Sequence, residues 1–235
     1  MLTPIPKQIP SNLAMSMGSW RTLKGVDRFI FSGPSNIEGF DQIQLPNKTF
    51  TPCDTDQYLD VPEYWRKMFF IAETRNHLLK YGRQYDYALF LDADVEVIPD
   101  LIERLMVHEK DIVSPLVRVP TNIGSGWGFG YFTDGWHEGW HFNNRITAPL
   151  QKVDAVASSC MFLSNHIMND SRLMFWPVKL KEDMYTGEDH GYCVRAKDLG
   201  YEAYVDTTIK LPHWKICWNH EQMKLELRPL RETDH

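Results

Sequence analysis

The sequence has little of what marks several common protein classes. It contains four cysteines in 235 residues and no C-x-x-C pair, which argues against a zinc module or a redox dithiol. Free thiols in a reducing compartment are the simplest interpretation, with a disulfide as the alternative. No apolar run approaches about 18 residues, and the N-terminal stretch MLTPIPKQIP lacks the apolar core of a signal peptide. We therefore expect no transmembrane segment and a cytoplasmic location.

The chain also lacks an excess of positive charge. The chain has 25 Lys and Arg residues against 31 Asp and Glu residues, a formal net charge of −6. A nucleic-acid-binding protein usually carries a basic stripe, so we expect no nucleic-acid partner. The composition, 43% hydrophobic and 24% charged, is typical of a globular protein, and the chain is long enough for one substantial core.

The hydrophobic pattern alternates between short apolar runs and segments with helical spacing. Strands are predicted at residues 2–5, 26–32, 87–91, 111–115, 153–163 and 202–206, and helices at 11–20, 62–81, 99–108 and 187–199. This alternation predicts an α/β fold with a mixed, mostly parallel sheet flanked by helices. In such sheets, ligands bind beyond the carboxyl ends of the strands.

The most informative stretch is YALFLDADVEVIPD, at residues 87–100. Asp92 and Asp94 directly follow an apolar run, and alternate residues of an extended segment face the same side, so both carboxylates can reach one ligand. A second D-x-D triplet, at residues 54–56, lies in a polar segment beside a proline and predicts only a solvated turn. A D-x-D triplet therefore indicates function only when it lies at the end of a strand, as Asp92 and Asp94 do.

Three chemistries use paired carboxylates in this way. An EF-hand loop is excluded, because its sixth position requires glycine and this sequence has Val97 there. A haloacid-dehalogenase-like phosphatase would use Asp92 as its nucleophile. Alternatively, Asp92 and Asp94 would hold Mn²⁺ or Mg²⁺, which would neutralise a diphosphate leaving group. The carboxylates alone leave these last two open.

Five segments together resemble GT-A-fold glycosyltransferases of the family 2-like, D-x-D-containing, nucleotide-sugar-dependent kind. They occur in the family's order: AETRN at 72–76, YALFLDADVEVIPD at 87–100, VDAVASSCMFL at 153–163, GEDHGY at 187–192 and LPHW at 211–214. The resemblance covers roughly residues 1–215. It implies a single GT-A-like domain over residues 1–235. Residues 1–115 would form the nucleotide-sugar-binding half, and residues 116–235 the acceptor-binding half and a C-terminal tail.

The resemblance also implies a reaction. A hexosyltransferase of this kind would move a sugar from a nucleotide-diphosphate sugar, such as a UDP- or GDP-sugar, to a hydroxyl of a glycan or other acceptor. Asp92, Asp94 and His213 would be the ligands of Mn²⁺ or Mg²⁺, with Asp94 the more direct ligand of the pair. Asp189 would be the catalytic base of an inverting reaction, with Glu188 as its neighbour and an acceptor contact.

Further residues are assigned to the two substrates. The residues expected to bind the donor are Thr3, Pro4, Ser32, Gly33, Arg75, Asp92 and Ala93. A structural salt bridge is the alternative for Arg75. The glycine-rich aromatic segment at residues 124–142 has no clean period and predicts a mobile lid, with core packing as its alternative. Aromatic rings stack on the apolar faces of sugars, so the residues expected to bind the acceptor are Trp127, Trp136 and Trp140.

Two other functions stay open at this point. A haloacid-dehalogenase-like phosphatase using Asp92 and Asp94 would leave His213 and the aromatic segment without a role. A non-catalytic carbohydrate-binding protein built on the aromatic segment would leave the acidic motifs unexplained. The glycosyltransferase hypothesis uses all of these features.

Overall fold

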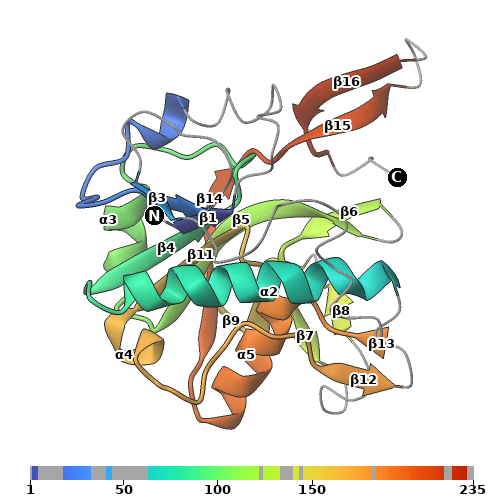
Figure 1. The fold of residues 1–235 in the computed structure, drawn as a ribbon. Helices are drawn as coiled ribbons and strands as arrows, with labels where there is room; N and C mark the ends of the chain where they lie inside the picture. The colour runs from blue at the N-terminus through green and yellow to red at the C-terminus, as the bar shows by residue number, and fades with distance from the viewer. Residues whose placement is uncertain are drawn as a thin grey trace.

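A computed structural model describes residues 2–4, 18–32, 41–43, 63–121, 124–132, 140–142, 145–181, 184–219 and 224–231. Within these ranges the chain forms a central twisted sheet with helices against both of its faces (Figure 1). The labelled helices are α2 (Glu63–Gly82), α3 (Leu101–Met106), α4 (Asn165–Met168) and α5 (Glu188–Asp198). The helices predicted at 62–81, 99–108 and 187–199 are therefore confirmed. Most of the helix predicted at 11–20 lies outside the described residues.

The main sheet has the strand order β3-β2-β1-β4-β11-β5-β14-β9, with β6 paired to β5. Its strands are β1 (Leu2–Pro4), β2 (Ile30–Ser32), β3 (Asp41–Ile43), β4 (Tyr87–Leu91), β5 (Ile112–Thr121), β6 (Gly124–Trp127), β9 (Leu150–Val153), β11 (Cys160–Ser164) and β14 (Ala203–Leu211). β4 coincides with its predicted bounds. β2 is shorter than predicted, and β5 and β14 are longer.

The expectation of a mostly parallel sheet is wrong. β3, β2, β1 and β4 run parallel to one another. Beyond β4, among the described strands, only the β5–β14 pairing is parallel, whereas β4–β11, β11–β5, β14–β9 and β5–β6 are antiparallel. The predicted strand at residues 153–163 is instead three strands, and the last of them, β11, inserts antiparallel between β4 and β5. Strands buried on both faces read as continuous apolar runs, so the pattern does not reveal their direction.

The remaining strands form three small sheets. They are β7 (Phe129–Phe132) with β8 (Trp140–Phe142) and β10 (Ala155–Val156), β12 (Lys179–Lys181) with β13 (Met184–Tyr185), and β15 (Trp214–Asn219) with β16 (Lys224–Pro229). The described part of the aromatic segment is thus built into strands, and Phe129 is buried in the core. This finding favours packing over a mobile lid for those residues.

The β4 strand shows how the core positions the acidic motif. Its side chains alternate between two hydrophobic clusters: Ala88 and Phe90 pack with α2, α4 and α5 on one face, and Leu89 and Leu91 pack with α3 on the other. Full burial of a Leu or Phe side chain stabilises a fold by about 1.5–3 kcal/mol. The strand is therefore fixed on both faces, and the D-x-D motif emerges from its end at a defined place.

Candidate metal centre

The D-x-D motif forms a turn at the carboxyl end of β4. The Asp92 N–H donates to the Ser159 carbonyl oxygen at 2.9 Å, and the Val95 N–H donates back to the Asp92 carbonyl at 3.1 Å. Val95 also forms an antiparallel bridge with His213, and the Trp214 N–H donates to the Asp94 carbonyl at 2.8 Å. The late histidine segment therefore lies directly beside the acidic turn.

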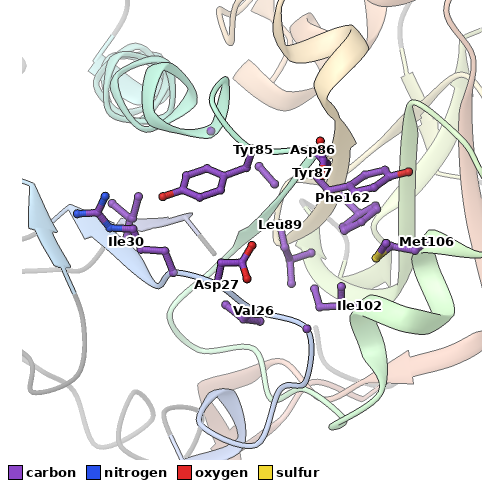
Figure 2. Close-up of a pocket in the computed structure, with 14 residues that line it drawn as sticks. Val26, Asp27, Ile30, Tyr85, Asp86, Tyr87, Leu89, Ile102, Met106 and Phe162 are labelled. Atoms are coloured by element: carbon purple, nitrogen blue, oxygen red, sulfur yellow. The ribbon is translucent and has the colours of Figure 1, made fainter.

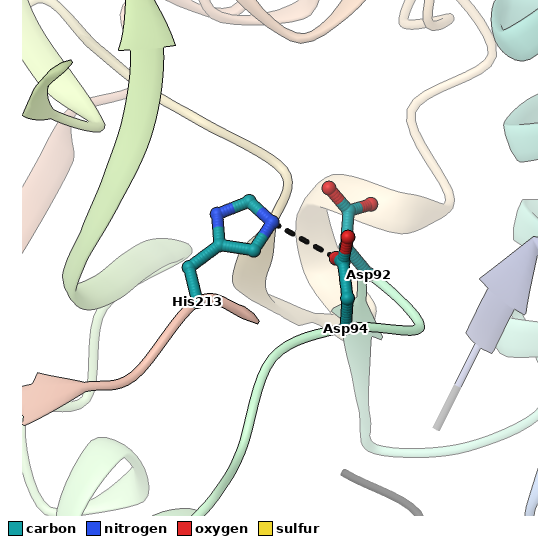
Figure 3. A group of neighbouring side chains, drawn as sticks. All are labelled: Asp92, Asp94 and His213. Carbon is teal, nitrogen blue, oxygen red and sulfur yellow. Dashed lines mark hydrogen bonds and ion pairs between the residues drawn. The ribbon is translucent and has the colours of Figure 1, made fainter. Parts of the chain in front are cut away.

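Asp92, Asp94 and His213 converge as a group that could hold a metal ion (Figure 3). Each side chain offers one ligand atom, and these atoms all lie within 4.8 Å of one another. His213 Nδ1 donates to the Arg118 carbonyl oxygen at 2.7 Å. Because a carbonyl oxygen only accepts, this bond leaves the Nε2 lone pair of a neutral ring free for a metal.

The donor set fits a hard divalent cation. His213 Nε2 lies 2.9 Å from Asp94 Oδ1. Neighbouring ligands of an octahedral ion, each about 2.1 Å from it, are about 3 Å apart, so this spacing suits two ligands of one ion. Three protein ligands leave positions open for oxygens of water or substrate. The nitrogen ligand favours Mn²⁺ over Mg²⁺, which takes oxygen ligands.

Two neighbours, His213 and Lys215, contact the two oxygens of the Asp94 carboxylate. Lys215 Nζ lies 2.6 Å from Asp94 Oδ2, while His213 contacts the other oxygen. Burial alone would raise the pKa of Asp94, but the hydrogen bonds and charges of His213 and Lys215 outweigh it and lower the pKa to about 2. Asp94 is therefore a carboxylate throughout the neutral pH range.

Arg75, on α2, joins the D-x-D turn to the Gly-Glu-Asp motif. Its Nη2 donates to Asp92 Oδ1 at 2.8 Å, and its Nη1 forms an ion pair with Glu188 Oε1. The Arg75 and Glu188 side chains are only 6% and 4% exposed. The structural salt bridge considered for Arg75 is thus present. Through it, the first aspartate and the start of α5 are held together.

Asp189 is fixed by donors from two sides. Its Oδ2 accepts from the Ser158 N–H at 3.0 Å and from the Ser158 hydroxyl at 3.3 Å, and its Oδ1 accepts from the His190 N–H at 2.8 Å. Burial would raise the pKa of Asp189, but the charges of His190 and Arg75 and the backbone donors lower it below its ordinary value. Asp189 is therefore ionised at neutral pH. Ser158 and Ser159 are adjacent, so one short segment contacts both acidic motifs.

Three of the expected donor-binding positions, Pro4, Ser32 and Asp92, lie at the carboxyl ends of the neighbouring parallel strands β1, β2 and β4. Leu2 pairs with Phe90, so Pro4, two residues further along β1, is level with Asp92, and Pro4 itself pairs with Ser32. Thr3 precedes Pro4 in β1, and Ala93 lies in the D-x-D turn. Gly33 lies outside the described residues.

The described structure does not bring the three expected acceptor residues together as it does the acidic residues. The Arg118 guanidinium lies over the Trp127 ring, 4.2 Å from the ring centroid, so a cation already covers one face of this indole. Trp140 begins β8, and Trp136 lies outside the described residues. Their role in acceptor binding stays a prediction.

Sequence reasoning missed Lys215 and Ser158. Lys215 follows His213 by two residues in an extended segment, a spacing that puts two side chains on one face and could have revealed it. Ser158 acts through its backbone N–H as well as its hydroxyl, and a backbone donor leaves no sequence signal.

A separate cavity of about 170 Å³ lies at the other end of β4 (Figure 2). Its walls include Tyr85, Leu89 and Ile102, and the Tyr87 ring stacks on Phe162 with centroids 5.0 Å apart. Tyr87 is the first residue of β4, whereas Asp92 follows the last. The cavity is therefore distinct from the metal centre.

Neither a protein-family model nor a curated protein sequence matches the chain. Among solved structures, GalNAc-T7 with UDP, GalNAc and Mn²⁺ is similar at a TM-score of 0.57 and 13% identity, over 90% of this chain and 43% of that protein. A197 from STIV is similar at a TM-score of 0.51 and 14% identity, over 100% of this chain and 96% of that protein. The chain thus spans less than half the length of GalNAc-T7.

These similarities establish the fold alone, because sequence identity is low. The chain has the fold of GT-A nucleotide-sugar transferases, as its sequence motifs indicated. In the described part of the chain, no helix combines the length and apolar character needed to span a bilayer.

Proposed function

We propose that the chain is a metal-dependent glycosyltransferase that moves a sugar from a nucleotide-diphosphate sugar to an acceptor hydroxyl. The observation that carries this proposal is the convergence of Asp92, Asp94 and His213 at the carboxyl end of β4 in a GT-A fold. The similar structure of GalNAc-T7 contains UDP, GalNAc and Mn²⁺, which supports a UDP-sugar as the first donor to test and a GDP-sugar as the second.

Asp92, Asp94 and His213 would hold the Mn²⁺ or Mg²⁺ ion. When bound, the metal supplies positive charge that neutralises the departing nucleotide diphosphate. Arg75 orients Asp92 through its 2.8 Å hydrogen bond, and Lys215 fixes the second oxygen of Asp94. The chain's own contribution at this side of the reaction is to hold both carboxylates in place and to keep Asp94 ionised.

Asp189 is the proposed catalytic base. It would accept the proton of the acceptor hydroxyl as that oxygen attacks the anomeric carbon, and direct displacement inverts the configuration there. Its lowered pKa means that it is ionised and ready to accept a proton, although a base with a pKa closer to 7 would be stronger. Ser158 and His190 hold the carboxylate in a fixed orientation.

The remaining assignments are carried over from the sequence motifs. Glu188, buried and paired with Arg75, would act on the site through that arginine, in addition to the acceptor contact expected from the sequence. The proposed donor contacts are Thr3, Pro4, Ser32, Gly33, Arg75, Asp92 and Ala93. The proposed acceptor contacts are Trp127, Trp136 and Trp140.

A thermal-shift screen of nucleotides and nucleotide sugars, with and without Mn²⁺, tests the proposal. A ligand at 100 times its Kd stabilises the native state by about 2.7 kcal/mol, which is a measurable rise in Tm. We expect the rise to need both Mn²⁺ and a UDP- or GDP-containing ligand, and to disappear with chelator. Absence of any metal-dependent shift would overturn the proposal. Glycan binding that ignores chelator would favour a carbohydrate-binding protein, and phosphate release from phosphomonoesters would favour a phosphatase.

A further inference from the structure

Two cations lie over the indole ring of Trp127. The Arg118 guanidinium is 4.2 Å from the ring centroid, and the Lys210 ammonium nitrogen is 5.9 Å from it. The face of an indole is electron-rich and attracts cations, so this ring holds both groups close together. A ring that carries two cations is less available to stack on a sugar. We call Arg118, Trp127 and Lys210 the basic cluster.

The main sheet explains why the three side chains meet. β5 lies between β6 and β14, with Arg118 paired to Trp127 on one side and Leu116 paired to Lys210 on the other. Leu116 and Arg118 are two residues apart on β5, so their side chains lie on the same face of the sheet. Trp127 packs against the hydrophobic cluster that contains Leu116. The basic cluster therefore occupies one face of three adjacent strands.

The basic cluster is attached to the metal centre. The Arg118 carbonyl oxygen accepts from His213 Nδ1 at 2.7 Å, and His213 Nε2 lies 2.9 Å from Asp94 Oδ1. Lys210 precedes His213 by three residues at the end of β14. Both cations are therefore carried by segments that also build the metal centre.

The same cluster is attached to the proposed base. Gly128, which follows Trp127, accepts at its carbonyl from the Ala157 N–H. A Cβ atom at Gly128 would lie 2.9 Å from the Ala157 Cβ, so the two segments are in close contact. The residue after Ala157 is Ser158, whose N–H and hydroxyl donate to Asp189. The acceptor has to reach both the metal centre and the base, and the basic cluster is joined to each.

Lys210 is exposed and available to a ligand. In the described part of the chain, no carboxylate forms an ion pair with it, whereas Lys152, Lys197 and Lys215 each pair with an acidic side chain. The metal centre and the base are built from carboxylates, which repel an anionic substrate. Such a substrate therefore needs cations beside these groups, and the basic cluster supplies them.

We propose that the basic cluster makes the chain specific for an acidic acceptor, one with a carboxylate, phosphate or sulfate group near the hydroxyl that receives the sugar. Lys210 binds this group directly, and Arg118 adds positive charge beside it. This inference rests on the proposed function, because it assigns the cluster to the acceptor of that reaction.

Glycan binding by the full chain, in the presence of Mn²⁺ and UDP, tests the proposal without measuring transfer. The probes are pairs that differ in charge: a galacturonate oligomer and its methyl ester, mannose phosphate and mannose, and galactose sulfate and galactose. In NMR titrations, we expect the acidic member of at least one pair to bind at least about tenfold more tightly than its neutral partner. Added salt should reduce this preference. Equal binding of both members of every pair, or binding of no acidic probe, overturns the inference.

Variants of Lys210 test whether the preference comes from the basic cluster. Lys210→Met should lose most of it, and Lys210→Arg should keep it, because arginine retains the charge. Lys152→Met is the matched control, because it removes another exposed lysine, beside the opposite end of β14, and should bind the probes like the wild type. A folded Lys210→Met protein with an undiminished preference for acidic probes overturns the inference.

Thermal shifts with Mn²⁺ and donor nucleotides separate the acceptor from the donor. We expect UDP to raise the Tm of the wild type and of Lys210→Met equally, and UDP-glucose and UDP-glucuronate to act alike. A smaller rise with UDP in the variant would assign Lys210 to the diphosphate, and a preference for UDP-glucuronate that the variant loses would assign it to the donor sugar. Either result overturns the inference alone. Absence of any metal-dependent binding of UDP overturns the proposed function and this inference with it.

Discussion

His213 Nε2 lies 2.9 Å from Asp94 Oδ1, although 119 residues separate the two in the sequence. The other ring nitrogen, Nδ1, donates to the Arg118 carbonyl, so Nε2 carries a hydrogen only when the ring is protonated. An unprotonated Nε2 and a carboxylate oxygen both offer lone pairs and repel one another. Their close approach therefore marks a place for a shared cation, either a proton or a metal ion.

Asp94→Asn should abolish metal binding while keeping the shape of the side chain. An amide is a weak ligand for Mn²⁺ compared with a carboxylate, and it removes the charge that pairs with the ion. We expect the Mn²⁺-dependent rise in Tm with UDP to vanish and sugar transfer to fall by about a hundredfold or more. Asp56→Asn, in the second D-x-D triplet, is the sequence-matched control. It should behave like the wild type, and an equal loss in both variants would contradict the assignment.

The lowered pKa of Asp94 predicts a specific loss of stability in acid. Its folded-state pKa is about 2 against an ordinary value of 3.8, so the carboxylate binds protons less readily in the folded state. Its contribution to stability is present above pH 3.8 and is lost as the pH falls toward 2. The loss between pH 5 and pH 2 amounts to about 2 kcal/mol in the free energy of unfolding.

Urea unfolding of the metal-free protein at these two pH values checks this prediction. Other acidic groups also titrate here, so the relevant quantity is the difference between the wild type and Asp94→Asn. The variant should lose about 2 kcal/mol less than the wild type over this interval. An identical pH dependence in both proteins would show that Asp94 is not stabilised by His213 and Lys215 in the folded state.

Arg75→Met should be strongly destabilising, because it leaves two carboxylates without their shared cation. Arg75 contacts Asp92 and Glu188, and the Glu188 side chain is only 4% exposed. Removing one partner of a buried pair costs about 3–5 kcal/mol. Adding Glu188→Gln removes the stranded charge, so the double variant should regain part of that loss. Urea unfolding of both proteins measures the difference, and a double variant less stable than Arg75→Met would refute the pairing.

Much of the acidic site could be predicted because its signals are local. An apolar run ending in Asp92 and Asp94 indicates both a strand and the place where it ends, and β4 coincides with the prediction. His213 could be placed beside them only through the order of the family's motifs, since nothing local in Pro-His-Trp indicates a metal ligand. The structure explains their proximity by the antiparallel bridge between Val95 and His213.

Strand direction was the main error, and the reason is physical. The apolar run around residue 160 reads the same whether β11 is parallel or antiparallel to β4, because both faces of the strand are buried. The pairing partner is decided by contacts between Phe162 and its neighbours in space, such as Leu89 and Val113. Those contacts join residues far apart in sequence and leave no local pattern.

Asp189→Asn tests the catalytic base. Asn is nearly the same shape and can still accept a hydrogen bond from Ser158 or His190, but it cannot take up a proton. We expect UDP and Mn²⁺ to bind with little change and turnover to fall by about 10²–10⁴-fold. Binding by calorimetry and transfer rate under saturating donor separate the two effects. Full turnover in the variant would eliminate Asp189 as the base, and retention of the anomeric configuration in the product would eliminate direct displacement.

Gly191→Ala should destabilise the protein, although alanine normally favours a helix over glycine by about 1 kcal/mol. A Cβ atom at Gly191 would lie 2.0 Å from the Trp176 carbonyl oxygen, far inside any contact that real atoms make. The same oxygen accepts from Arg195 Nη1, also on α5, at 2.7 Å, so the Trp176 backbone cannot move away from the helix without losing this hydrogen bond.

We therefore expect Gly191→Ala to reduce the free energy of unfolding by about 3 kcal/mol, measured by urea denaturation. Asp198→Ala, at an exposed position on the same helix, is the control and should stay within about 0.5 kcal/mol of the wild type. Because α5 begins at Glu188 and carries Asp189, an outward shift of the helix would also weaken the Ser158–Asp189 contact. A Gly191→Ala protein as stable as the wild type would mean that α5 does not pack against Trp176 this closely.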